Sequence, residues 1–427
     1  MATERILTRN VFVAGGNPDV TYNPRDARRL EADIREFMAQ SGKALSVSGP
    51  TKSGKTVLIQ RLLPESQAIW LHGSDIADPS AFWRAIVDWF GMYDTIELTD
   101  DRAVRLGAEG SVEGGVPGFG KVSATASGDQ TTASGARYAR TRTYSDLARE
   151  RLATTPVPIV IDDFHYIPEA ARREISRAIK TLIRIVPVVM IAVPHEAFDA
   201  VTQEPEMGGR VWHLKITLWT EDELACIAEA GFAALGIVDL GGAVTQRLAA
   251  SSFGAPFLMQ QLCFDICAAH EIYEAQHDTS PVLSEPDGGW DGFFLRIAER
   301  SVPPVFEMLR KGPKVRGQER IARVFKDGRQ TDIYGAVLSA LAEAGPKPAT
   351  PQPELVRILT ARLEEPARGQ HISSALAQMS EIADDARGDS DPALVFKSDE
   401  VYILDPFLLF YLRFGDWSME SYTGTAR

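Results

Sequence analysis

Eight residues near the start of the chain form a pattern that binds phosphate. The run from Gly49 to Thr56 fits G-x-x-x-x-G-K-[ST]. In such a loop the backbone N–H groups point inward at the phosphates, and the N-terminus of the following helix adds positive potential. Lys55 would reach the β- and γ-phosphates, and the Thr56 hydroxyl would bind Mg²⁺. The residues expected to contact a nucleotide are Gly49, Pro50, Thr51, Lys52, Ser53, Gly54, Lys55, Thr56 and Val57.

A second pattern supplies carboxylates. The apolar run that begins at Val157 ends in Asp162 and Asp163, which is typical of a central parallel strand whose C-terminal end enters a site. Asp162 is expected to hold the Mg²⁺ shell, and Asp163 to polarise an attacking water. Taken alone, the run would also suit a buried strand followed by an acidic cap on a helix that starts near Pro168.

The surrounding elements predict an α/β fold that presents both patterns at one edge of a parallel sheet. Further strands are expected at 69–72, 188–193 and 216–218, and helices alternate with them. A helix over 25–41 is expected before the first strand, because apolar residues share one face of it. From Thr220 onward the pattern is helical over 221–234, 242–250 and 256–270.

A glycine-rich stretch interrupts this core. Residues 107–135 contain eight glycines, with apolar residues on alternate positions around them. The alternation favours a weak hairpin arm, whereas the composition equally suits a flexible insertion. An ordered arm would offer a surface for self-assembly.

The C-terminal part predicts a winged helix. Helices are expected over 333–344, 353–363 and 372–382, followed by a hairpin around Ser398 and an aromatic helix over 405–414. The third helix would be the reader of DNA, yet residues 371–381 contain no Lys or Arg. Residues 331–427 carry eight basic and fifteen acidic side chains, so this part is poorly equipped for a duplex.

The bulk composition excludes several classes of protein. A net charge of −13 argues against sequence-independent coating of nucleic acid. The exception is 296–329, with ten basic and four acidic residues, which would either hold a phosphate backbone or pair with the acidic parts beside it. Three cysteines make no disulfide framework, and no apolar run would span a membrane, so a cytoplasmic protein is expected.

On these motifs the chain resembles P-loop ATPases of the AAA+/STAND group, closest to archaeal and replication-initiator-like ATPases with a C-terminal winged helix. The strongest elements are Gly49–Thr56, Ile159–Asp163 and the segment from Leu404 to Arg413, with Asp405-Pro406 inside it. The doubled carboxylate resembles the STAND version more than the Asp-Glu pair of AAA+ motors. The resemblance implies ATP and Mg²⁺ as cofactors, and it places Arg210 where the family carries an arginine that reaches a γ-phosphate, often a neighbouring subunit's.

Two departures from the family pattern affect the expected rate of ATP hydrolysis. The polar sensor expected after 188–193 is neither Asn nor Thr, and His195 is the nearest candidate. The lid helix that begins at Gly254 has no arginine at its start. Hydrolysis is therefore expected to be slow or dependent on assembly.

The predicted organisation has four parts. These are an ATPase core over 1–220 with the insertion at about 94–142, a helical lid over 221–295, a basic linker over 296–330 and a winged-helix domain over 331–427.

The interpretation that these patterns favour is a regulatory ATPase whose assembly depends on nucleotide. It would form a homo-oligomer and control a separate protein effector, and the resemblance connects such ATPases with conflict or defence systems. One alternative is an ATP-dependent initiator or transposition-type regulator that binds DNA, with 296–329 as its contact. Another is a scaffold that binds ATP without turnover.

Overall fold

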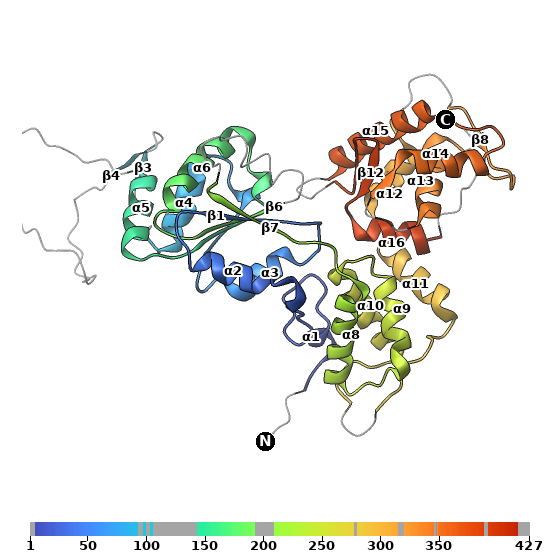
Figure 1. Ribbon diagram of the computed structural model, residues 1–427, viewed down its shortest axis with the longest axis horizontal. Helices are drawn as coiled ribbons and strands as arrows, with labels where there is room; N and C mark the ends of the chain where they lie inside the picture. Colours follow the sequence, from blue (N-terminus) through green and yellow to red (C-terminus); the bar gives the residue numbers. More distant parts are fainter. Residues whose placement is uncertain are drawn as a thin grey trace, which may run out of the picture.

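The computed structural model describes residues 5–92, 97–99, 103–105, 143–192, 209–276, 280–314, 320–345, 347, 349–387 and 392–416. An α/β part built on one parallel sheet is followed by two helical parts (Figure 1). The helix α16, near the end of the described chain, lies between those two helical parts. No helix among the described residues is long and apolar enough to cross a membrane.

The central sheet has five parallel strands in the order β2-β5-β6-β1-β7. In register, Ala44 at the start of β1 pairs with Val188 of β6 and with Val211 of β7. All five strands therefore end at the same edge of the sheet. The strands are β1 (Ala44–Ser48), β2 (Ile69–His72), β5 (Ile159–Asp162), β6 (Val188–Ala192) and β7 (Val211–Lys215).

Helices cover both faces of this sheet (Figure 1). The strands β1, β5 and β6 are buried along their whole length, as expected for a sheet with two covered faces. Ile159 and Ile161 face one core, whereas Val160 between them faces the other. The first core lies under α4 (Pro79–Trp89), α5 (Tyr144–Thr154) and α6 (Glu169–Leu182), and the second under α2 (Leu30–Met38) and α3 (Lys55–Leu62).

Two expectations about the ends of this part were wrong in detail. The last strand lies at 211–215 rather than 216–218. The prediction missed it because β7 is an edge strand in which only Leu214 is buried, so its residues are less apolar than those of a central strand. The helix expected over 25–41 is split into a short 3₁₀ turn, η1 (Asp26–Arg28), and α2. Arg29 between them adopts a left-handed conformation with φ 56°.

The glycine-rich stretch at 107–135 lies outside the described residues. Within the predicted insertion, the structure describes two short antiparallel strands, β3 (Glu97–Thr99) and β4 (Ala103–Arg105).

The lid helices follow the sheet. They are α8 (Glu221–Leu235), α9 (Ala243–Ala250), α10 (Pro256–Ala269) and α11 (Gly289–Arg300). A capping box starts α8, in which the Thr220 hydroxyl accepts from the Glu223 N–H and the Glu223 carboxylate accepts from the Thr220 N–H. The short helix α1 (Thr8–Val11) packs against α8 and α10, so the N-terminal segment joins the lid.

The C-terminal part forms the expected winged helix. Its helices are α13 (Ile333–Ala344), α14 (Gln352–Arg362), α15 (Gly369–Ala386) and α16 (Pro406–Phe414). The hairpin of β11 (Leu394–Lys397) and β12 (Glu400–Ile403) gains a third strand, β10 (Ala349–Pro351), on its β12 edge. The sequence did not predict β10, because three residues, the last of them a proline, are too few for an alternating pattern to appear.

The segment predicted as a basic linker contains regular structure. It includes the end of α11, the helix α12 (Pro304–Lys311), and the strands β8 (Arg323–Val324) and β9 (Gln330–Thr331). The helix α12 packs against α13 and α15 of the winged helix. Arg320 pairs with the buried carboxylate of Asp332, the residue that caps α13.

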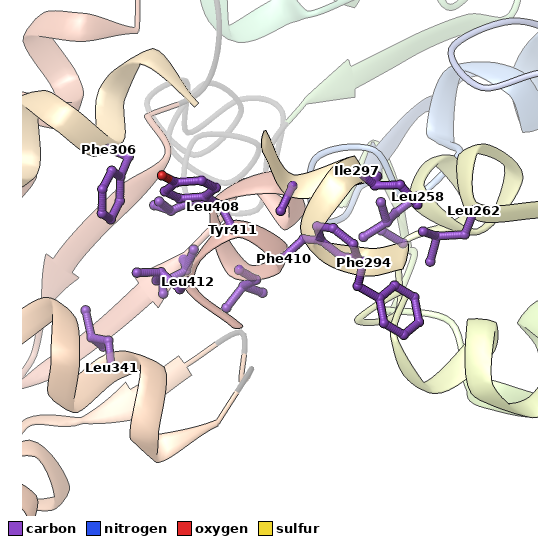
Figure 2. Packing of buried hydrophobic residues seen from close by; sticks show 14 of the residues in the cluster. Leu258, Leu262, Phe294, Ile297, Phe306, Leu341, Leu408, Phe410, Tyr411 and Leu412 are labelled. Atoms are coloured by element: carbon purple, nitrogen blue, oxygen red, sulfur yellow. The ribbon is translucent and has the colours of Figure 1, made fainter. Parts of the chain in front are cut away.

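One continuous hydrophobic core joins the lid helices to the winged helix. In Figure 2, α16 carries Phe410 toward Phe294 of α11, while Tyr411 lies beside Phe306 of α12. The ring centroids of Phe294 and Phe410 are 6.0 Å apart, and those of Phe306 and Tyr411 are 4.7 Å apart. The lid and the winged helix are therefore packed as one unit, whereas the sheet has its own two cores.

Candidate nucleotide site

The loop from Gly49 to Thr56 connects β1 to α3 at the carboxyl edge of the sheet. Two of its glycines are required by geometry. Gly54 has φ 89°, a left-handed conformation that glycine adopts without a steric penalty. At Gly49 a Cβ atom would lie 2.6 Å from the carbonyl oxygen of Ile216, so the chain after β7 leaves no room for a side chain.

Thr56 and Asp162 meet beside this loop. The Thr56 hydroxyl donates to a carboxylate oxygen of Asp162 at 3.0 Å, although the residues are 106 positions apart. Asp162 is 5% exposed, and its other oxygen accepts from the Asp163 N–H at 3.0 Å. The structure therefore brings together two residues, Thr56 and Asp162, that the sequence predicted to share a Mg²⁺ ion.

Lys55, next to Thr56, and Asp163, next to Asp162, differ in their exposure. Lys55 is buried at the start of α3 and donates to the carbonyl oxygens of Gly49 and Pro50 at 2.8 and 3.0 Å. Asp163 is exposed, follows the end of β5 with φ 51°, and lines the same cavity as the loop. Its left-handed backbone turns the chain away from the strand direction, which separates its carboxylate from that of Asp162.

A cavity of 560 Å³ opens over the loop. Its floor is formed by 51–58, and one wall by residues 13–25, here called the N-terminal strap. Trp219, Pro256 and Phe257, at the junction with the lid, line the cavity next to the strap. The Trp219 indole donates to the carbonyl oxygen of Ser53 at 2.9 Å, which ties that junction to the loop. The residues predicted to bind phosphate thus line a partly apolar pocket of ligand size.

Buried polar side chains hold the strap in place. Gln260 of α10, 4% exposed, accepts from the Val13 N–H at 3.1 Å and donates to the Thr21 hydroxyl at 2.7 Å. Arg25, also 4% exposed, pairs with Glu223 at 2.8 Å and lies over the Trp219 ring at 4.9 Å. One wall of the cavity is therefore fastened directly to the lid.

The strap contact also affects the ionisation of Glu223. Burial raises the pKa of this carboxyl, but hydrogen bonds from Arg25, the Thr220 backbone and Arg28 outweigh burial, so the pKa lies below its ordinary value. The ionised form is the one that holds the strap.

Arg210 lies at the other end of the sheet from the loop. Its carbonyl oxygen accepts from the Ala44 N–H at 2.8 Å, which places it beside the start of β1. The loop follows the end of β1, five residues later, at about 3.3 Å a residue. Arg210 is therefore not brought to the loop of its own chain. The candidate sensor, His195, lies outside the described residues.

The oxygen ligands present suit a magnesium ion held partly by a nucleotide. Among the described residues no cluster of three or more His, Cys, Asp or Glu side chains is arranged to hold a metal alone. Mg²⁺ typically uses one or two protein oxygens and completes its octahedron with phosphates and water. The paired Thr56 hydroxyl and Asp162 carboxylate are such a donor set.

Several residues of the site were not predicted from the sequence. The strap, Gln260, Arg25 and Trp219 lie far from both motifs and carry no pattern of their own. A buried glutamine and a buried arginine become recognisable only when their partners are seen. Lys52 was predicted as a loop residue, but its contact with Asp405, described below, was not.

Comparison with known proteins gives likenesses of fold. No family model matches the chain, and no curated protein matches it. Among solved structures, Cdc6p from Pyrobaculum aerophilum aligns with 95% of this chain and 97% of its own, at 12% identity and a TM-score of 0.42. The Aeropyrum pernix ORC2 protein, solved as ADPNP–ADP complexes, covers the same shares at 12% identity and a TM-score of 0.48.

A third similar structure is a STAND protein with a tetratricopeptide repeat sensor from Pyrococcus horikoshii. It matches 93% of this chain and 43% of its own length, at 12% identity and a TM-score of 0.36. The similarity to these structures is one of fold. The predicted fold class, a P-loop parallel sheet with a helical lid and a C-terminal winged helix, is confirmed by the strand order and by the three-stranded wing.

Proposed function

We propose that this protein is an ATP-binding regulatory ATPase that acts as a nucleotide-dependent assembly switch. The observation that carries the proposal is the contact between Thr56 and Asp162 at the floor of the cavity, next to Lys55. A hydroxyl, a buried carboxylate and a lysine at a helix N-terminus match what a nucleoside triphosphate with Mg²⁺ requires.

In this proposal the cavity takes the whole nucleotide. Loop N–H groups bind the phosphates, and Lys55 exchanges its carbonyl contacts for the terminal phosphates. Thr56 and Asp162 hold Mg²⁺, whose charge stabilises the phosphates when bound. The strap and the Trp219 side of the cavity enclose the base and sugar.

Hydrolysis would use Asp163 as the residue that orients water. Asp163 is exposed and lines the cavity, which is consistent with such a role. Because phosphoryl transfer depends mainly on positioning and charge, an incomplete set of cations would make turnover slow.

Assembly of several subunits would complete the set of cations around the phosphates. Arg210 is remote from the loop of its own chain and lies at the start of the edge strand β7. In an oligomer it would reach the nucleotide of a neighbouring subunit, and such an arginine stabilises charge in the transition state. ATP would thereby favour contacts between subunits, and the assembled form would act on a protein effector.

The DNA-binding alternative has less support from the residues described. Several basic side chains of 296–329 are already paired within the chain: Arg300 with Asp265, Arg310 and Lys311 with Glu307, Arg320 with Asp332, and Arg329 with Asp327. Binding to phosphate would have to replace these contacts, which lowers the electrostatic gain. We therefore retain the assembly switch as the proposal.

Phosphate release from ATP, measured with and without Mg²⁺, tests the enzymatic part. Lys55→Ala is expected to abolish nucleotide binding. Asp163→Asn is expected to bind ATP normally and to release phosphate at least about tenfold more slowly, because a catalytic carboxylate contributes on the order of 10²–10⁴-fold. If neither substitution changes the rate of phosphate release, the proposal is contradicted. If the wild type binds ATP but releases no phosphate, the protein is a scaffold that binds ATP without turnover.

A further inference from the structure

Lys52, within the phosphate loop, forms an ion pair with the winged helix. Its ammonium lies 3.3 Å from a carboxylate oxygen of Asp405, the residue that precedes α16 and is 353 positions away in the chain. The Lys52 side chain is 33% exposed and that of Asp405 25%, so water only partly screens the pair. The C-terminal part therefore contacts the nucleotide site directly.

Two aromatic rings hold the same ammonium. The Lys52 nitrogen lies 4.3 Å from the ring centroid of Phe407 in α16 and 5.5 Å from that of Phe257 in α10. These rings pack edge to face with their centroids 5.3 Å apart. A cation near a ring face gains electrostatic stabilisation, so three elements converge on one charge.

We propose that the Lys52–Asp405 contact is an autoinhibitory connection, in which the winged helix and the terminal phosphates of ATP compete for Lys52. This inference rests on the proposed function, since it assumes that the loop binds ATP. With α16 docked, Asp405 neutralises a cation of the loop, so the docked form binds ATP less tightly. By thermodynamic reciprocity, ATP weakens the docking of α16 by the same factor.

Release at this point would have consequences beyond the loop. The helix α16 belongs to the core that joins the lid to the winged helix. Loss of the Asp405 and Phe407 contacts would remove one of the connections between this unit and the sheet part, without breaking the unit's own core. The side of α16 that contacts the loop would then become accessible to another subunit, which connects the contact with assembly.

Asp405 can be neutralised without removing its second role. Its carboxylate also caps α16 by accepting from the Phe407 N–H at 3.0 Å. Asparagine caps helices about as well as aspartate, so Asp405→Asn removes the charge and keeps the cap. The matched control is Asp399→Asn, which makes the same charge change in the β11–β12 turn, at an exposed position with φ 60° that asparagine tolerates.

Titration calorimetry with ADPNP and Mg²⁺ tests the proposal on full-length proteins. Asp405→Asn is expected to bind ADPNP up to about fivefold more tightly than wild type, the range of a partly exposed ion pair. Asp399→Asn is expected to match wild type. In a Lys52→Met background, Asp405→Asn is expected to change nothing, because the cation for which the two partners compete has been removed.

Hydrogen exchange of the first turn of α16, which contacts Lys52, supplies an independent readout, because the rest of the helix stays packed in its core. In wild type, ADPNP is expected to speed exchange at this turn, whereas in Asp405→Asn exchange at this turn is already fast without nucleotide. If wild type binds ADPNP but Asp405→Asn binds it equally or more weakly, the inhibitory contact is overturned and the proposed function stands. If no variant with an intact Lys55 binds ADPNP, the proposed function fails, and this inference fails with it.

Discussion

The sheet part and the unit formed by the lid and the winged helix are built on different principles. In the sheet part, short motifs at strand ends place polar groups together, and two separate cores pack on the two faces of the sheet beneath them. In the lid and winged helix, one hydrophobic core runs through both helical parts. The first region gathers polar groups at one edge of a sheet, whereas the second joins two helical parts into one packed unit.

Several contacts between these regions lie close to the loop. Among the described residues they include the Trp219 indole on the loop carbonyl, the strap held by Gln260 and Arg25, and the Lys52–Asp405 pair. All of these contacts border the cavity or the loop. A nucleotide bound there would therefore act on several connections between the two regions at once.

The largest expected effect tests whether the lid and the winged helix form one cooperative unit. Phe410 is 1% exposed and packs on Phe294 across the boundary. Phe410→Ala should lower the free energy of unfolding by about 3–5 kcal/mol, because it leaves a cavity in a shared core. Hydrogen exchange should rise in α10 and α11 as well as in α13 to α16.

The matched substitution in the other region is Phe82→Ala. Phe82 of α4 is fully buried in one core of the sheet part. A similar loss of stability is expected, with exchange rising in β2 and β5 but not in α10 or α13. If Phe410→Ala raises exchange only in α13 to α16, the lid and the winged helix unfold separately, and the contrast between the two regions is wrong.

A smaller effect concerns the strap that fastens the cavity to the lid. Because the folded-state pKa of Glu223 is lowered, its contribution to stability is present above the ordinary pKa of glutamate, about 4.3, and is lost as pH falls through the lower folded value. Wild type should lose about 1–2 kcal/mol of unfolding free energy from this group on acidification, the value of charge-assisted hydrogen bonds.

Paired denaturation curves across pH check this expectation. Glu223→Gln keeps a side chain suited to the capping box but removes the charge, so it should be less stable at neutral pH and show a flatter acid profile. Glu221→Gln, an exposed acid in the first turn of the same helix, is the control and should follow wild type. Identical profiles for Glu223→Gln and wild type would show that the charged contact with Arg25 does not stabilise the strap.

What the sequence predicted follows the same division between regions. The P-loop and the run ending at Asp162 are local patterns, so the sheet part and the meeting of Thr56 with Asp162 were predictable. The winged helix was predictable from periodicity, with element ends within a few residues. The strap, the third strand of the wing and the Lys52–Asp405 pair depend on residues far apart in the chain, and no local pattern specifies such contacts.

The central claim is that ATP at the loop drives assembly, and mass in solution tests it most directly. Light scattering on a sizing column compares wild type with Lys55→Ala, each with and without ATP and Mg²⁺. The account predicts a larger species that forms only when ATP is added to wild type. Arg210→Ala is expected not to form a stable species of this size. A wild-type mass that stays constant while ATP demonstrably binds would contradict the assembly switch and the role of Arg210 across subunits.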